Sequence, residues 1–327
     1  MKINRNLKYA LVLSGGGARS LVHVGILSAM EKAGYPPPSL VAGTSMGAIV
    51  GGLYASGMKS AELRRFILEE LDIASFMESS VFKLQGPLGR IFQAGQALGS
   101  VTSKLGIDSG AKVLSLLEEF SGGKKIEDCA IPFLCNAVDL NSGKELVFRS
   151  GSLARAIRAS MSFPLVFEPH IEGDLCLVDG GVADNMPVRA AREAGAALGI
   201  RRFLAVDTRR WRRVSPEHFR NGINVIMRCF DVLVRRMELR SEGAEKFKRA
   251  DLILRAVDNS GIVDFSRKRE LLALGEAAVR ASGAELDAFF GSGIRAALAR
   301  RKKMDCGIVL DIPYEDSGKY GAEVPIE

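Results

Sequence analysis

Short apolar runs alternate along the chain with segments whose apolar residues recur three and four positions apart. The first pattern predicts buried strands and the second predicts helices that cover them. The predicted strands are residues 9–13, 40–42, 133–138, 145–148, 204–206 and 252–254, and the predicted helices include residues 20–32, 46–55, 60–71 and 113–120. This alternation favours an α/β fold with a sheet covered on both faces.

Two segments depart from the alternation. Glycines interrupt an apolar series that ends near residue 108 and still fits one helix face, which predicts a lid at about residues 72–108. From residue 301 onward, basic and acidic side chains mix with two prolines, which predicts an extended C-terminal tail over residues 301–327. We therefore expect a single domain over residues 1–300, which carries the lid and is followed by the tail.

The composition is that of a globular protein, with 47% apolar and 25% charged residues among 327. Five cysteines form an odd set without a Cys-x-x-Cys pair, which argues against a disulfide framework and a zinc site and favours a reducing, cytoplasmic compartment. We expect no cofactor. The first apolar run is too short for a secretory signal, and no run approaches the ~18 apolar residues of a membrane span, so any membrane contact is expected to be peripheral.

Basic residues gather in the second half of the chain, and the formal net charge is +7. Six arginines flank the single tryptophan, Trp211, and further basic residues follow between positions 235 and 249. Such a stripe fits the phosphate groups of an anionic membrane surface or of nucleic acid, and it equally fits a solvated face. The charge pattern leaves these interpretations open.

The stretch VAGTSMGAIVGG places Ser45 between two glycines, after an apolar run and before a helical one. A nucleophilic serine on a sharp strand-to-helix turn needs such glycines, because the turn leaves no room for side chains. The start of the helix also adds a positive dipole near a developing oxyanion. The alternative is that Ser45 only caps the helix, and Gly-x-Ser-x-Gly alone does not decide between the two roles.

The stretch SGGGARS, residues 14–20, also lies between a predicted strand and a predicted helix. Successive glycines let backbone N–H groups point at one spot, which serves an oxyanion hole or a phosphate site. A dinucleotide fingerprint requires glycine where this chain has Ser20, and a P-loop requires a Gly-Lys pair that is absent here. The oxyanion hole is therefore the favoured interpretation.

A serine nucleophile needs a base, and the chain offers few histidines. They are His23, His170 and His218, and none lies in a context that marks it as a base. Among the carboxylates, Asp179 in VDGGVADNMPV precedes two glycines on a tight loop that another backbone can approach. Asp174 and Asp184 remain alternatives, as does a purely turn-forming role for Asp179.

Four stretches of this chain resemble the signature blocks of the patatin-like phospholipases in order and separation: GGGARSLVHVGIL, GTSMG, AIRASMSFPLVFEP and DGGVADNMPV. They run from Gly15 to about Val188, and residues 270–280 are similar to the end of the bacterial members. The resemblance implies a three-layer αβα fold with a mainly parallel central sheet, and a Ser-Asp dyad without histidine. It implies Ser45 as nucleophile, Asp179 as base, and an oxyanion hole formed by the amides of Gly15, Gly16 and Gly17 and supported by Arg19.

Two positions differ from the pattern of that family. The family usually has Arg-Gly where this chain has Arg19-Ser20, and we expect the added Ser20 side chain to cap the helix that follows. In NAVDL, residues 136–140, the family commonly has threonine before the aspartate, and we expect Asp139 to be structural.

The resemblance implies a serine acyl hydrolase whose substrates are carboxylic esters of lipids or phospholipids. An aspartate of ordinary pKa, about 3.9, is a poor base for serine, so we expect the fold to remove Asp179 from water. The alternatives are a non-catalytic acyl-lipid or regulatory binding protein on the same fold, and a binder of phosphate or nucleic acid. We disfavour nucleic acid as a partner, because a binding protein has no chemical need for a nucleophile and a base together.

Overall fold

The computed structural model describes residues 2–71, 108–208, 250–257, 264–293 and 304–309, together with a few single positions. The expected lid lies outside the described residues except for Asp108. Trp211, His218 and most of the basic stripe also lie outside them.

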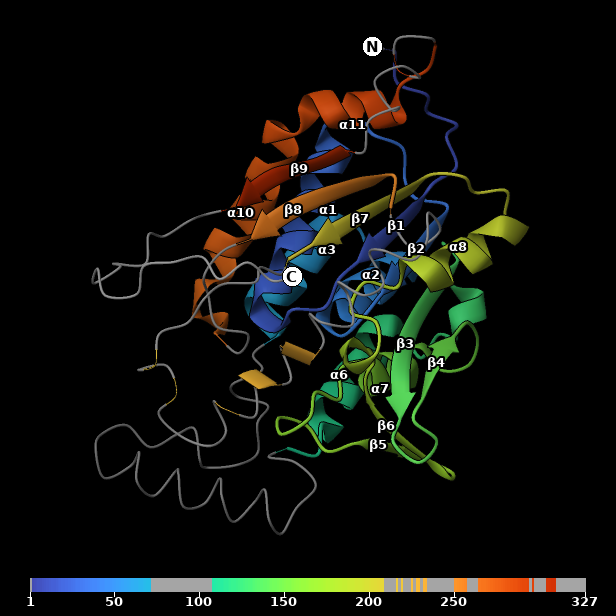
Figure 1. Ribbon diagram of the computed structural model, residues 1–327, viewed down its shortest axis with the longest axis vertical. Coiled ribbons are helices and arrows are strands. Elements are labelled where there is room, and N and C mark those ends of the chain that lie inside the picture. The colour runs from blue at the N-terminus through green and yellow to red at the C-terminus, as the bar shows by residue number, and fades with distance from the viewer. Residues whose placement is uncertain are drawn as a thin grey trace, which may run out of the picture.

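The described strands form one sheet that crosses the molecule from β9 to the hairpin of β5 and β6 (Figure 1). They are β1 (Ala10–Leu13), β2 (Leu40–Gly43), β3 (Phe133–Asp139), β4 (Lys144–Phe148), β5 (His170–Glu172), β6 (Leu175–Asp179), β7 (Phe203–Asp207), β8 (Leu252–Val257) and β9 (Met304–Val309). Their order is β5-β6-β3-β2-β1-β7-β8-β9, with β4 paired to β3 outside this path. The pairings from β3 through β2, β1, β7 and β8 to β9 are parallel, and those among β3, β4, β5 and β6 are antiparallel. The predicted α/β class with a mainly parallel sheet is confirmed.

The helices connect and cover these strands. The described helices of six or more residues are α1 (Val22–Lys32), α2 (Met46–Ala55), α3 (Ser60–Arg65), α6 (Ala111–Ser121), α7 (Leu153–Ser160), α8 (Val188–Ala197), α10 (Lys268–Ala281) and α11 (Gly283–Phe290). A 3-10 turn, η1 (Gly17–Leu21), leads into α1. Within the described part of the chain, no helix has the length and apolar character that a membrane crossing requires.

The two larger apolar cores lie on opposite faces of the sheet. Along β1, Leu11 and Leu13 belong to the first core, whereas Ala10 and Val12 belong to the second. The first core also contains residues of α1, α2 and α10, and the second contains residues of α8. Because successive strand side chains point to opposite faces, helices cover the sheet on both sides. This is the expected three-layer αβα arrangement.

Strand β3 brings two other strand ends together. Gly43, the last residue of β2, pairs with Cys135, and Asp179, the last residue of β6, pairs with Ala137. Strand β4 pairs with both of these β3 residues and therefore occupies the opposite edge. Since β2 is parallel to β3 and β6 is antiparallel to it, the carboxyl ends of β2 and β6 meet head-on beside Asn136. The hairpin of β5 and β6 was not predicted from the sequence.

The extended tail predicted from residue 301 does not hold for residues 304–309. They form β9, which pairs in parallel with β8 from Met304 opposite Leu252 to Val309 opposite Val257. The run MDCGIV contains an aspartate and a glycine, both disfavoured in strands, and this hid the element in the sequence. Pairing with β9 satisfies backbone groups that β8 would otherwise present at an open edge.

Helices α1 and α10 approach each other until their backbones touch. A Cβ atom on Gly25 would lie 1.9 Å from the carbonyl oxygen of Leu272, and one on Gly275 would lie 2.1 Å from that of Val22. Glycine at both positions therefore permits the close approach. The contact fixes the position of α1, which begins where the Gly-rich loop and η1 end.

Candidate active site

Ser45 lies in the tight turn between β2 and α2. Its backbone has φ 55° and ψ −124°, and a positive φ is rare for a residue other than glycine. A Cβ atom on Gly43 would lie 2.4 Å from the carbonyl oxygen of Gly47, and one on Gly47 would lie 2.3 Å from that of Leu13. The two glycines of Gly-x-Ser-x-Gly are thus required by the packing of this turn.

The side chain of Ser45 does not cap α2. Ser45 occupies the N-cap position of the helix, but its hydroxyl makes no hydrogen bond to the first turn. Its backbone amide donates to the hydroxyl of Ser160 at the end of α7, at 2.9 Å. The strained conformation therefore brings no capping benefit, and the hydroxyl is left for another role.

Asp179 ends β6 and is only 2% exposed. Its Oδ1 accepts the backbone amide of Gly181 at 2.7 Å. Its Oδ2 is buried and has no partner of ordinary hydrogen-bond geometry among the described residues, yet the Ser45 side chain is close enough to act on the carboxylate. Burial raises the pKa of Asp179 to about 6, and the nearby Ser45 side chain and the hydrogen bond from Gly181 only partly oppose this shift.

No hydrogen bond joins a histidine to Ser45 or Asp179 within the described ranges. His23 is fully buried in α1, and burial lowers its pKa to about 4, so its ring is neutral at pH 7. Its Nε2 lies 2.8 Å from the carbonyl oxygen of Ser14 and therefore carries the donating hydrogen. His170 lies on β5, half-buried. Neither of these histidines therefore bonds to Ser45 or Asp179.

The alternative carboxylates serve turns. Asp174 is exposed in the turn between β5 and β6, and Asp184 accepts the backbone amide of Met186 at 3.0 Å. Asp139 holds its own turn, as expected: the Ser142 hydroxyl and nearby backbone amides bond to it and lower its pKa to about 2. Nowhere in the described part of the chain do three or more His, Cys, Asp and Glu side chains gather to hold a metal ion.

The Gly-rich loop lies directly against the Ser45 turn. A Cβ atom on Gly15 would lie 3.0 Å from Cβ of Ser45 and 2.5 Å from Oδ1 of Asn185. The amide of Gly15 donates to the carbonyl oxygen of Asn185 at 3.1 Å, and the Asn185 side chain donates back to the carbonyl oxygen of Gly15 at 3.0 Å. The Gly15 amide is therefore already used, although the resemblance assigned it to the oxyanion hole.

The next two glycines retain the geometry of a donor loop. Gly17 has a φ of 58°, which only glycine adopts without strain. No hydrogen bond from the amide of Gly16 or Gly17 occurs among the residues that the structure describes. Arg19 reaches back toward the loop, with its Nε 3.5 Å from the carbonyl oxygen of Gly16.

Ser20 is buried against the Gly-rich loop and does not cap α1, contrary to expectation. Its hydroxyl lies 3.1 Å from that of Thr208 and 3.4 Å from the carbonyl oxygen of Ser14. The Thr208 hydroxyl in turn donates to the carbonyl oxygen of Gly15 at 3.2 Å. A Cβ atom on Gly16 would lie within 2.8 Å of both hydroxyls, so this buried cluster packs closely on the loop.

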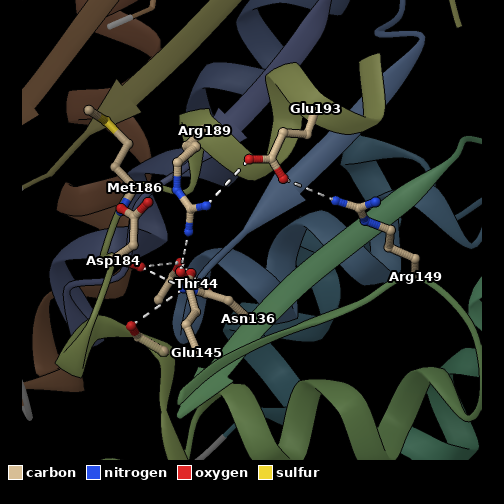
Figure 2. A network of polar contacts seen from close by, with 9 residues as sticks. Thr44, Asn136, Glu145, Arg149, Asp184, Met186, Arg189 and Glu193 are labelled. Atoms are coloured by element: carbon tan, nitrogen blue, oxygen red, sulfur yellow. Dashed lines mark hydrogen bonds and ion pairs between the residues drawn. The ribbon is translucent and has the colours of Figure 1, made fainter. Parts of the chain in front are cut away.

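Sequence reasoning missed the polar side chains that hold the site together. They are Thr44, Asn136, Ser160 and Asn185. The signal for Asn136 was its place in a strand that is buried along its whole length, because a buried amide requires partners. Figure 2 shows the polar network around it.

Residues 11–192 match a family model described as "Patatin-like phospholipase", which covers more than half of the chain. An uncharacterised NTE family protein of Mycobacterium tuberculosis is 33% identical over 195 residues, which are 59% of this chain and 48% of that protein. A lysophospholipase NTE1 of Mycosarcoma maydis is 32% identical over 215 residues, which are 65% of this chain and 10% of that protein. The chain thus spans about half the length of the mycobacterial relative and a tenth of the fungal one.

Among solved structures, VipD from Legionella pneumophila resembles the chain with a TM-score of 0.43 and 15% identity. The match covers 83% of this chain and 67% of that one.

Proposed function

We propose that this chain, which belongs to the patatin-like phospholipase family, is a serine hydrolase of lipid carboxylic esters. In this proposal Ser45 is the nucleophile and Asp179 is the base. One observation carries the proposal. Ser45 has a strained backbone and its side chain does not cap α2, and it lies close to the buried carboxylate of Asp179, whose pKa is raised to about 6. Relatives named as lysophospholipases support a lipid ester as substrate.

In the proposed reaction, Ser45 Oγ attacks the ester carbonyl carbon while its proton moves to Asp179. The amides of Gly16 and Gly17 and the N-terminus of α2 stabilise the oxyanion. The tetrahedral intermediate breaks its bond to the alcohol, which leaves with the proton from Asp179. Water then attacks the acyl-enzyme and gives a proton to Asp179, and that proton returns to Ser45 as the fatty acid leaves.

Labelling with a fluorophosphonate tests the nucleophile. We expect a single adduct on Ser45, found by intact and peptide mass spectrometry, and no adduct in Ser45→Ala. The same preparation should release fatty acid from a lysophospholipid, whereas Ser45→Ala should not. A folded parent protein that is neither labelled nor active would favour the non-catalytic acyl-lipid binding protein.

The pH dependence of hydrolysis tests the base. We expect kcat/KM for an uncharged ester to fall tenfold per pH unit below about pH 6 and to be flat above it, because only the ionised carboxylate accepts a proton. Initial rates would be measured alongside circular dichroism, since buried His23, with a pKa of about 4, favours unfolding in more acidic solution. A midpoint near the ordinary aspartate pKa of about 3.9 would contradict the assignment.

A further inference from the structure

Asn136 lies on β3 at the junction between the strands that carry the proposed dyad. Gly43, one residue before the nucleophile turn, pairs with the residue before Asn136, and Asp179 pairs with the residue after it. The Asn136 side chain is fully buried. A buried amide therefore stands where the nucleophile-bearing and base-bearing strands meet.

The Asn136 amide bonds to the residue before Ser45 and to the residue after Asp179. Figure 2 shows Asn136 beside Thr44, Asp184 and Glu145. Its Oδ1 accepts the hydroxyl of Thr44, the residue before Ser45, at 2.7 Å. Its Nδ2 donates to the carbonyl oxygen of Asp184 at 2.8 Å and to that of Gly180, the residue after Asp179, at 3.4 Å. One planar group thus links the start of the nucleophile turn to the loop that follows the base.

Glu145 fixes the orientation of this amide. Its Oε1 accepts Nδ2 of Asn136 at 2.9 Å, and its Oε2 pairs with Arg189 of α8 at 2.8 Å. Because the groups around Nδ2 are acceptors, a flipped amide would set oxygen against oxygen. At the other end of the amide, the hydroxyl of Thr44 donates to Oδ1, which fixes the same orientation.

The loop after the base packs directly on Asn136. A Cβ atom on Gly180 would lie 2.4 Å from both the carbonyl oxygen and Oδ1 of Asn136. The glycine that follows Asp179 is therefore required by this contact. It follows that the Asn136 side chain sets how closely the loop approaches β3.

We propose that Asn136 is a positioning residue that sets the separation of the Ser45 hydroxyl and the Asp179 carboxylate. This role rests on the proposed function. Asn136 acts through Thr44 and Gly180 rather than on substrate. A dyad without histidine has no third side chain to orient its base, so the orientation must come from the backbone at the strand ends, which this amide ties together.

The variant Asn136→Ala tests the role. We expect kcat to fall about 100-fold with little change in KM, because loss of the tie misplaces the reacting groups without altering the substrate pocket. Fluorophosphonate labelling of Ser45 should slow in parallel. The matched control is Leu134→Ala, which truncates another buried side chain of the same strand in the second core. It should lower the free energy of unfolding but retain the parental kcat at a temperature where it is folded.

Thr44 offers a second and gentler test. Thr44→Val keeps the shape and removes the hydroxyl that bonds to Asn136, so it should lower kcat in the same direction. Thr44→Ser keeps the hydroxyl and should retain activity. The Thr44 hydroxyl bonds to Asn136 and also lies 3.2 Å from the carbonyl oxygen of Asp184, which Asn136 binds as well. Because the two residues share these contacts, adding Thr44→Val to Asn136→Ala should slow the reaction by less than Thr44→Val slows the parent.

Three outcomes would overturn the positioning role. The first is a folded Asn136→Ala whose kcat stays within about twofold of the parent or equals that of Leu134→Ala. The second applies if Asn136→Ala does not fold: equal activity of Thr44→Val and Thr44→Ser would then overturn the role. The third is a parent protein that is neither labelled nor active, which would overturn the proposed function together with this role. If the parent is active, either of the first two outcomes overturns only the role of Asn136.

Discussion

Asp179→Asn is expected to abolish ester hydrolysis and, at the same time, to stabilise the folded protein above about pH 6. Asparagine keeps the shape of the side chain and can still accept the amide of Gly181. It cannot take the proton of Ser45, and the loss of a general base costs roughly 100- to 10,000-fold in rate. The variant should therefore be folded and inactive.

The stabilisation follows from the burial of the carboxylate. Its pKa rises from 3.8 to about 6 on folding, so the folded state binds the proton more tightly than the unfolded state. The contribution of Asp179 to stability is therefore highest below pH 3.8, falls as the pH rises to about 6, and stays low above that. The difference between the two pKa values corresponds to at most about 3 kcal/mol, which the neutral asparagine does not lose.

Urea unfolding of the parent and Asp179→Asn at about pH 8 and about pH 4.5 would measure this effect. We expect the variant to unfold at higher urea concentration than the parent at the upper pH, and the difference between the two proteins to be clearly smaller at the lower pH. Hydrolysis by the variant at the parental rate, or equal stability at both pH values, would show that Asp179 is not the buried base.

Asp139→Asn is the matched control, because its effect should have the opposite sign. Hydrogen bonds from Ser142 and the backbone lower the pKa of Asp139 to about 2, so its ionised form supports folding. That support is present above the ordinary aspartate pKa and is lost as the pH falls through about 2. Asp139→Asn should therefore destabilise the protein at neutral pH and leave the dyad intact.

The sequence was informative where local geometry decides the structure. The turn at Ser45 requires glycines within two positions of it, and the run that follows becomes α2 over the predicted residues 46–55. The alternation of strands and helices likewise predicted the sheet and its layers. In both cases the determining residues are neighbours in the sequence, so a short pattern contains the information.

Long-range pairings were not visible in the sequence. The Gly15 amide donates to the carbonyl oxygen of Asn185, which lies on the loop after β6. No pattern within the Gly-rich loop itself shows that this amide is already hydrogen-bonded. Ser20 had an evident local role as a cap, but tertiary contacts with Thr208 took precedence. The role of Asn136 depends on β2 and β6 meeting on one edge of β3, which follows only from the pairing of distant strands with β3.

Gly25→Ala is expected to be the most destabilising of the small substitutions in the sheet-covering helices. The added methyl group would lie 1.9 Å from the carbonyl oxygen of Leu272, which belongs to the backbone of α10 and cannot rotate away. The two helices must separate, and overpacking of this kind costs about 1 to 3 kcal/mol or more. The better helix propensity of alanine, about 1 kcal/mol, offsets only part of the cost.

Urea unfolding at neutral pH would measure the loss, and Gly283→Ala is the matched control. Gly283 opens α11, and a Cβ atom there would meet no atom within 4 Å, so this variant should keep or slightly exceed the parental stability. Gly25→Ala should also slow labelling of Ser45, because α1 follows directly from η1 and the Gly-rich loop, and a shifted helix moves the proposed oxyanion donors. Parental stability in Gly25→Ala would mean that α10 is free to move away from α1. The position of the Gly-rich loop would then have to be set by its own contacts with Asn185 and with the buried hydroxyls of Ser20 and Thr208.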